Sequence, residues 1–111
     1  MNGRISLFNE GACRMTGLSE ELMLGHQAME LYPEPEKILA VLRRSLKRPH
    51  EHALIETDLL GAAGRRVPVQ MSIGWITGEG GVITGVIGVA KDITEQRKLE
   101  HDLLKKAIAF T

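Results

Sequence analysis

Alternating apolar and polar residues identify the second half of the chain as β-structure. From Val67 to Trp75 every second side chain is apolar, which is the period of a half-buried strand. A similar run, Ala53–Leu60, precedes it and a third, Val82–Ala90, follows, with glycine-rich segments at 61–64 and 78–81 between them. Such short connections favour an antiparallel meander. Successive apolar positions in Val82–Ala90 predict a strand that is covered on both faces.

The first half of the chain has helical spacing. A helix is predicted to start at Pro35, a residue suited to the first helical position, and to end at Pro49 after a cluster of basic residues. Its apolar face consists of Ile38, Val41, Leu42 and Leu46. Two short helices precede it, capped by Asn9 and Ser19, and Arg4–Phe8 is predicted to be a short strand. Helices followed by a sheet indicate the α+β class.

The stretch GVAKDITEQRKLE passes from the last strand into a charged C-terminal helix. Asp92 is predicted to cap this helix, with Glu95 three residues later at capping-box spacing. Asp92 or Thr94 can each accept the unpaired N–H groups, and Arg97 is within helical reach of either. The predicted apolar stripe consists of Leu99, Leu103, Ala107 and Phe110, widened by Leu104 and Ile108. The helix either folds back on its own sheet or, as we prefer, forms a seam between two protomers.

Composition limits the classes of protein to consider. A chain of 111 residues is one domain. Fourteen acidic residues balance fourteen basic ones, so no net field attracts nucleic acid. No apolar run is long enough to span a bilayer. The sequence shows no secretory signal, and its single cysteine, Cys13, cannot form an internal disulfide. These features lead us to expect a cytoplasmic protein.

No arrangement of residues in the sequence supports catalysis. There is no phosphate-binding glycine loop with its lysine, and capping already accounts for Asp92 and Glu95. His50 and His52 share one face if they lie on a strand, which is half of a metal site, but no third and fourth ligands are evident. We therefore expect neither enzymatic activity nor a bound metal.

Taken together, several segments resemble the PAS domain, the sensory module of bacterial signalling proteins such as sensor histidine kinases of two-component systems. The segments are GRISLFNEGACRMTGLSEELMLG, PEKILAVLRRSLK, RRVPVQMSIGWI and GVITGVIGVAKDITEQRKLE. The resemblance implies an antiparallel sheet with short helices on one face, homodimerisation, and output through a coiled-coil helix to a kinase, cyclase or transcription effector. It divides the chain into a sensor at 1–92 and a signalling helix at 93–111.

The resemblance also assigns candidate site residues. Asp92, Ile93 and Thr94 match the family's joint between the last strand and the output helix, with Arg97 as the ion-pair partner of Asp92. Between sheet and helices the family has a small-molecule pocket. The residues that could line it here are Val41, Leu42, Met71, Ile73, Trp75 and Gly88. The same residues also describe an ordinary packed core, which we favour.

Whether the protein binds a cofactor, and which one, stays open. Haem-binding relatives carry a histidine on the long helix, and Ile38–Lys47 contains none. Cys13 lies outside the sequence context of the flavin-adduct cysteine of light-sensing relatives.

The chain departs from the family pattern in lacking the first apolar strand, which leaves four or five strands in the expected sheet. One edge of Val86–Lys91 would then be unpaired and open to another chain. Two functions follow: a sensory and dimerisation module that signals through the Asp-Ile-Thr joint, or a ligand-independent interaction module that sets the oligomeric state.

Overall fold

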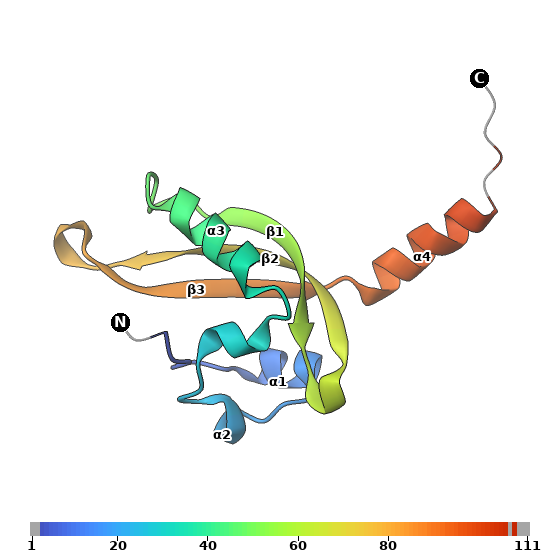
Figure 1. The fold of residues 1–111 in the computed structure, drawn as a ribbon, viewed down its shortest axis with the longest axis horizontal. Coiled ribbons are helices and arrows are strands. Elements are labelled where there is room, and N and C mark those ends of the chain that lie inside the picture. The colour runs from blue at the N-terminus through green and yellow to red at the C-terminus, as the bar shows by residue number, and fades with distance from the viewer. Residues whose placement is uncertain (1–2, 107, 109–111) are drawn as a thin grey trace.

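A computed structural model describes residues 3–106 and 108 (Figure 1). The α-helices are α1 (Glu10–Thr16), α2 (Glu20–Met23), α3 (Pro35–Ser45) and α4 (Thr94–Lys105). The strands are β1 (Ala53–Leu60), β2 (Arg66–Thr77) and β3 (Ile83–Asp92). Three short 3-10 helices are η1 (Ala28–Leu31), η2 (Ala62–Gly64) and η3 (Glu79–Gly81). The α+β class predicted from the sequence is confirmed.

The sheet is an antiparallel meander in the order β1-β2-β3. In its register Val69 of β2 lies opposite Thr57 of β1 and Asp92 of β3. Each connection is a tight turn built on a 3-10 helix. Each turn has two residues at positive φ, Ala63 and Gly64 in the first and Gly80 and Gly81 in the second.

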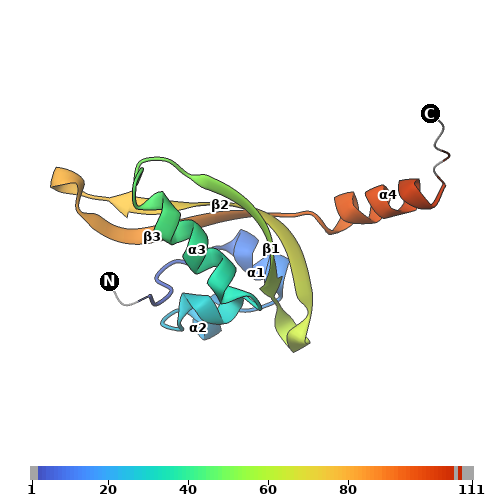
Figure 2. The ribbon, with the colours of Figure 1, turned by 45° about the horizontal axis from the view of Figure 1, so that its top comes forward.

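One face of the sheet carries the hydrophobic core. Helix α3 crosses this face, and α1 and α2 lie beyond it on the same side (Figures 1 and 2). The apolar face of α3 packs on the inward side chains of β1 and β2, as the helical spacing of α3 and the alternation in the strands predict. The buried cluster consists of Ile38, Val41, Leu42, Leu59, Val67, Val69, Met71 and Ile73.

The predicted helix starts in the first half are confirmed by their caps. The Asn9 side chain accepts a hydrogen bond from the N–H of Ala12, and that of Ser19 accepts one from Leu22. Pro35 is the first residue of α3. However, α3 ends at Ser45, before the predicted end at Pro49.

Two predictions about strands are wrong. The described residues form three strands, not four or five. Arg4–Phe8 is not a strand of the sheet: Arg4 forms an isolated bridge with Gln27, and Ile5 bonds to Gly25 and His26. Strand β3 is mostly exposed and not covered on both faces. It lies at a sheet edge, where only β2 pairs with it among residues 3–106 and 108, so its apolar side chains have less to pack against.

Helix α4 projects beyond the end of the sheet and does not fold back on it (Figures 1 and 2). Leu99 and Leu103 of the predicted stripe are 64% and 70% exposed, so the stripe has no partner within the described chain. Ala107 and Phe110 lie outside the described residues. No helix in the described part of the chain has the length and apolar character needed to cross a membrane.

Candidate functional site: the joint between sheet and terminal helix

Ile93 anchors the start of α4 in the body of the domain. Its side chain is only 3% exposed. Its N–H donates to the carbonyl of Pro68 on β2 at 3.0 Å, and its own carbonyl accepts the N–H of Arg97 at 2.9 Å. The first turn of the helix is therefore bonded to the sheet through one buried residue.

Asp92 and Thr94 flank this anchor. One carboxylate oxygen of Asp92 accepts the backbone N–H of Thr94 at 2.8 Å and its hydroxyl at 2.5 Å. Asp92 thus satisfies one of the N–H groups that a helix start leaves unpaired. The residue in the N-cap position is Ile93, not Asp92 as predicted, and the Ile93 side chain makes no capping hydrogen bond. The helix starts one residue later than predicted because Ile93 is drawn into the core.

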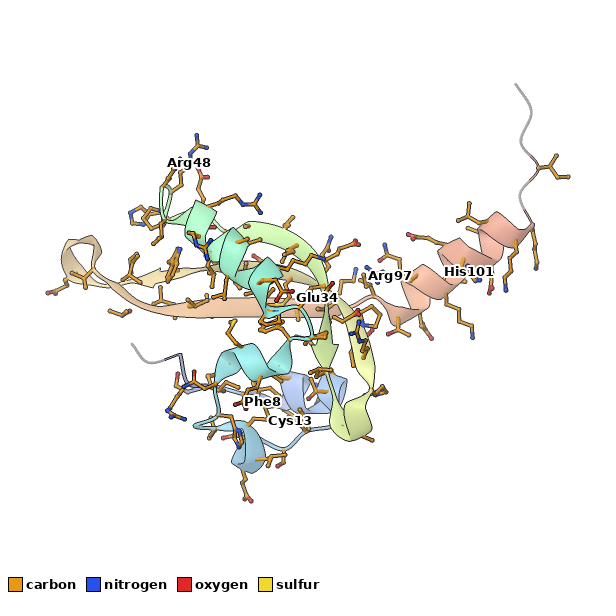
Figure 3. All side chains as sticks on the ribbon, in the orientation of Figure 1. Phe8, Cys13, Glu34, Arg48, Arg97 and His101 are labelled. Carbon is orange, nitrogen blue, oxygen red and sulfur yellow. The ribbon has the colours of Figure 1, made fainter. Side chains whose placement is uncertain are left out.

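Arg97 pairs with a residue far away in the sequence. Its guanidinium lies 3.1 Å from the carboxylate of Glu56 on β1, so the predicted ion pair with Asp92 is wrong. Arg97 sits at the base of α4, whereas His101 lies further out along the helix (Figure 3). Glu56 and Arg97 are each about half exposed. Such a pair adds little stability, and it brings the first turn of α4 alongside β1.

The joint therefore holds α4 at two points from different strands. Ile93 and Asp92 continue directly from β3, and Arg97 reaches across to Glu56 on β1. What it can do physically is set the orientation of a helix that leaves the domain.

The residues predicted to line a ligand pocket are placed mainly in the core. Val41, Leu42, Met71 and Ile73 belong to the buried cluster. Gly88 of β3 lies opposite Ile73 of β2. A Cβ added at Gly88 would meet the terminal methyl of Met71 at 2.6 Å. The volume that the glycine leaves is thus occupied by Met71.

Two polar groups near this core have partners in the protein. The indole N–H of Trp75 donates to the carbonyl of Leu42 at 3.2 Å. The hydroxyl of Tyr32 contacts the sulfur of Met71 at 3.7 Å, and burial raises the pKa of this phenol above its ordinary value. The hydroxyl of Thr57, in contrast, is buried without a hydrogen-bond partner.

Two surface cavities lie mostly away from the predicted pocket residues. The first, of about 330 Å³, is an open groove at the end of α3 that includes Val41 of the predicted set. The second, of about 340 Å³, lies between residues 6–10 and α2. The groove at the end of α3 is lined by Val41, Arg44, Ser45, Lys47, Arg48, Glu51, His52, Ala53 and Leu54. Within residues 3–106 and 108, no three His, Cys, Asp or Glu side chains are grouped to hold a metal ion.

Two residues of the joint were missing from the predicted site. Pro68 supplies the carbonyl that holds Ile93, and Glu56 supplies the carboxylate that holds Arg97. No local pattern identifies either one, because each contact spans more than 20 residues. Glu56 carries one weak signal, since it is an acidic residue on the polar side of an alternating strand.

Comparison with known proteins assigns the fold. A sequence model of the PAS domain family matches residues 1–95. The PAS domain of a protein from Colwellia psychrerythraea superposes with a TM-score of 0.71 at 22% identity, covering 78% of this chain and 75% of that one. Among curated proteins none matches significantly.

Two further structures are similar in fold. A sensory box histidine kinase/response regulator from Burkholderia thailandensis has a TM-score of 0.64 at 15% identity, with 88% of this chain and 75% of that one covered. The dark structure of the LOV domain of the blue-light photoreceptor Aureochrome1 has a TM-score of 0.70 at 17% identity. The match covers 96% of this chain and 80% of that one.

Proposed function

The chain belongs to the PAS domain family, and from this premise we propose that it is a sensory and dimerisation module that passes a conformational bias through Asp92–Thr94 into α4. In this proposal the chain is not itself an enzyme. It acts in the cytoplasm on a histidine kinase or a similar effector, attached or separate.

The observation that carries the proposal is the contrast between the two parts of α4. Its first turn is held by the buried Ile93, by Asp92 and by the pair between Arg97 and Glu56. The rest of the helix leaves the domain with Leu99 and Leu103 exposed. A helix fixed at its base and apolar along its length is suited to transmit a change in orientation to whatever packs on it.

Dimerisation is the natural use of the exposed stripe. Apolar residues at Leu99 and Leu103 recur at helical spacing, and a second copy of the chain can cover them in a two-helix seam. Paired helices would convert a small tilt at each joint into a change in the seam. We propose a homodimer with this seam as one of its contacts.

A second function, that of a ligand-independent interaction module, is favoured by the packing of the core. Met71 fills the space beside Gly88, and Leu42 already accepts the indole N–H of Trp75. A domain of this kind would set the oligomeric state of its effector without responding to a small molecule. The two functions share the joint and differ in whether the core admits a ligand.

Light scattering and amide exchange on the purified full chain test the proposal. Light scattering over a dilution series should show a dimer, and Leu103→Glu should shift it to monomer. Amide exchange should become faster in the first turn of α4 when Asp92 is replaced by alanine. A monomer at all concentrations, or unchanged exchange, would contradict the proposal. Native mass spectrometry and an absorption spectrum then separate the two functions, since a co-purifying small molecule supports sensing.

A further inference from the structure

Glu56 is bonded from two sides by two different helices. Its backbone carbonyl accepts a 2.5 Å hydrogen bond from the ammonium group of Lys37 on α3. Its carboxylate lies 3.1 Å from the guanidinium of Arg97 on α4. A single residue of β1 thus contacts both the helix that covers the core and the helix that leaves the domain.

The position of Glu56 in the sheet relates it to the joint. Glu56 lies opposite Gln70 of β2, and Gln70 lies opposite Lys91 of β3, the neighbour of Asp92. Glu56 and Asp92 therefore hold the base of α4 from the two outer strands of the sheet. An arrangement with two points of support determines a direction, which one point alone does not.

The position of helix α3 depends on how the core is packed. Its buried residues Ile38, Val41 and Leu42 pack on the sheet, so a change in core packing displaces the helix that carries Lys37. The bond from Lys37 would transmit that displacement to the peptide group of Glu56. The carboxylate of Glu56 would then shift the point at which Arg97 is held.

We propose that Glu56 is a positioning residue that couples the placement of α3 to the orientation of α4. The inference rests on the proposed function of α4 as the output element and names the route by which the core reaches it. If the contacts that Lys37 and Arg97 make with Glu56 were independent surface interactions, removing one contact would not change the effect of removing the other. Coupling through Glu56 instead predicts that removing one contact changes what the other does.

The chain offers a matched control on the same strand. Asp58 lies two residues after Glu56, so its side chain is on the same face of the sheet. It forms a comparable ion pair with Arg66 at 3.4 Å. Both members of that pair are in the sheet, and no helix is involved. Asp58→Asn thus removes one carboxylate charge from β1 without touching the proposed route.

The test measures the direction of α4 in the full chain. With Cys13 replaced by serine, spin labels at His101→Cys and Glu79→Cys report the distance between α4 and the far turn of the sheet. Dilution with unlabelled protein removes distances between protomers.

Glu56→Gln and Lys37→Met should each shift and broaden the distance distribution, although Lys37 lies on α3. In the Glu56→Gln background, Lys37→Met should add no further change. Asp58→Asn should leave the distribution as it is.

The outcomes separate this inference from the proposed function. A wild-type distribution for Lys37→Met, or an additive effect of Lys37→Met and Glu56→Gln, would overturn the coupling. If Asp92→Ala changes the distribution and Glu56→Gln does not, the inference fails while the proposed function stands. If neither substitution changes it, the proposed function fails as well. Circular dichroism of each variant confirms that the domain remains folded.

Discussion

The indole nitrogen of Trp75 lies 3.2 Å from the carbonyl oxygen of Leu42 and bonds β2 to the last turns of α3. A helix end leaves its final carbonyls without intrahelical partners. Here the N–H of Leu46 bonds to Arg43, and the side chain of Trp75 takes the carbonyl of Leu42. The bond fixes the C-terminal end of α3 on the sheet.

Replacing Trp75 by phenylalanine should weaken the fold measurably. The variant keeps most of the apolar ring and removes the donor, so the free energy of unfolding should fall by about 0.5–1.5 kcal/mol. Urea unfolding followed by circular dichroism measures the change. Leu54→Ala is the control, because this exposed side chain should matter by no more than about 0.5 kcal/mol. Equal stability of Trp75→Phe and wild type would contradict a structural role for the bond.

Asp92→Ala should destabilise the start of α4 more than the body of the domain. The variant leaves the N–H of Thr94 without its acceptor, a loss of about 1 kcal/mol by comparison with helix-capping residues. Thr94→Val is the matched control, since it removes the 2.5 Å hydroxyl bond and keeps the backbone one. Thermal unfolding with amide exchange measures both. If the two variants behave alike, the backbone bond is not what holds the helix start.

The joint also shows how far the sequence predicts a site. The Asp-Ile-Thr segment and the charged helix after it could be located from local spacing alone. The partner of Arg97 could not, because Glu56 is 41 residues away and only the folded sheet brings the two together. The N-cap was misplaced by one residue because the burial of Ile93 in the core outweighs the capping preference of Asp92.

The strands of the sheet also differ in how well the sequence predicts them. Strict alternation in Val67–Trp75 predicted β2 well, since one face of the strand is buried and the other is not. The continuous apolar run of β3 was misread as a strand covered on both sides. Apolar composition measures the tendency to be buried, and whether a neighbour is present depends on the rest of the fold. Arg4–Phe8 did not provide that neighbour.

Adding a methyl group at Gly88 should strain the core. Its Cβ would lie 2.6 Å from the terminal methyl of Met71. This methyl is the far end of a flexible side chain that can turn aside, so the cost should fall at the low end of overpacking, about 1 kcal/mol. Met71→Leu removes that terminal methyl, so the double variant should be less destabilised than the sum of the single ones. Urea unfolding of all three variants measures the difference. An unchanged stability of Gly88→Ala would instead show that Met71 moves aside without cost.

The stability of the domain should decline in alkali through Tyr32. An ordinary tyrosine ionises near pH 10, and burial raises the pKa of Tyr32 in the folded state. The unfolded chain therefore loses this proton first, and stability that is complete below about pH 10 is lost as the pH rises through the folded pKa. Tyr32 is the single tyrosine of the chain. Above pH 10 the free energy of unfolding should thus fall less steeply in Tyr32→Phe, and parallel curves for both proteins would contradict this role.

The exposed edge of β3 should promote self-association. Ile83–Ala90 carries no charged residue, and among the described residues only β2 pairs with this strand. An uncharged, unpaired edge strand invites pairing with another chain. Val89, 64% exposed, lies on this strand in the same cross-sheet row as Leu54 at the opposite edge, with Ser72 between them. Lysine at either position places a charge on the same face of the sheet, but only Val89→Lys places it on the open edge of β3.

If the β3 edge forms the contact, Val89→Lys should raise the dissociation constant of the dimer at least about ten-fold, a change of about 1.4 kcal/mol, and Leu54→Lys should have little effect. If the flat face forms the contact, both variants should weaken the dimer. Light scattering across a dilution series distinguishes these results, and amide exchange in Val86–Val89 provides a second measurement. A wild-type monomer at micromolar concentration with slow exchange through these residues would refute association by the edge, since it would require the open edge to be protected within one chain.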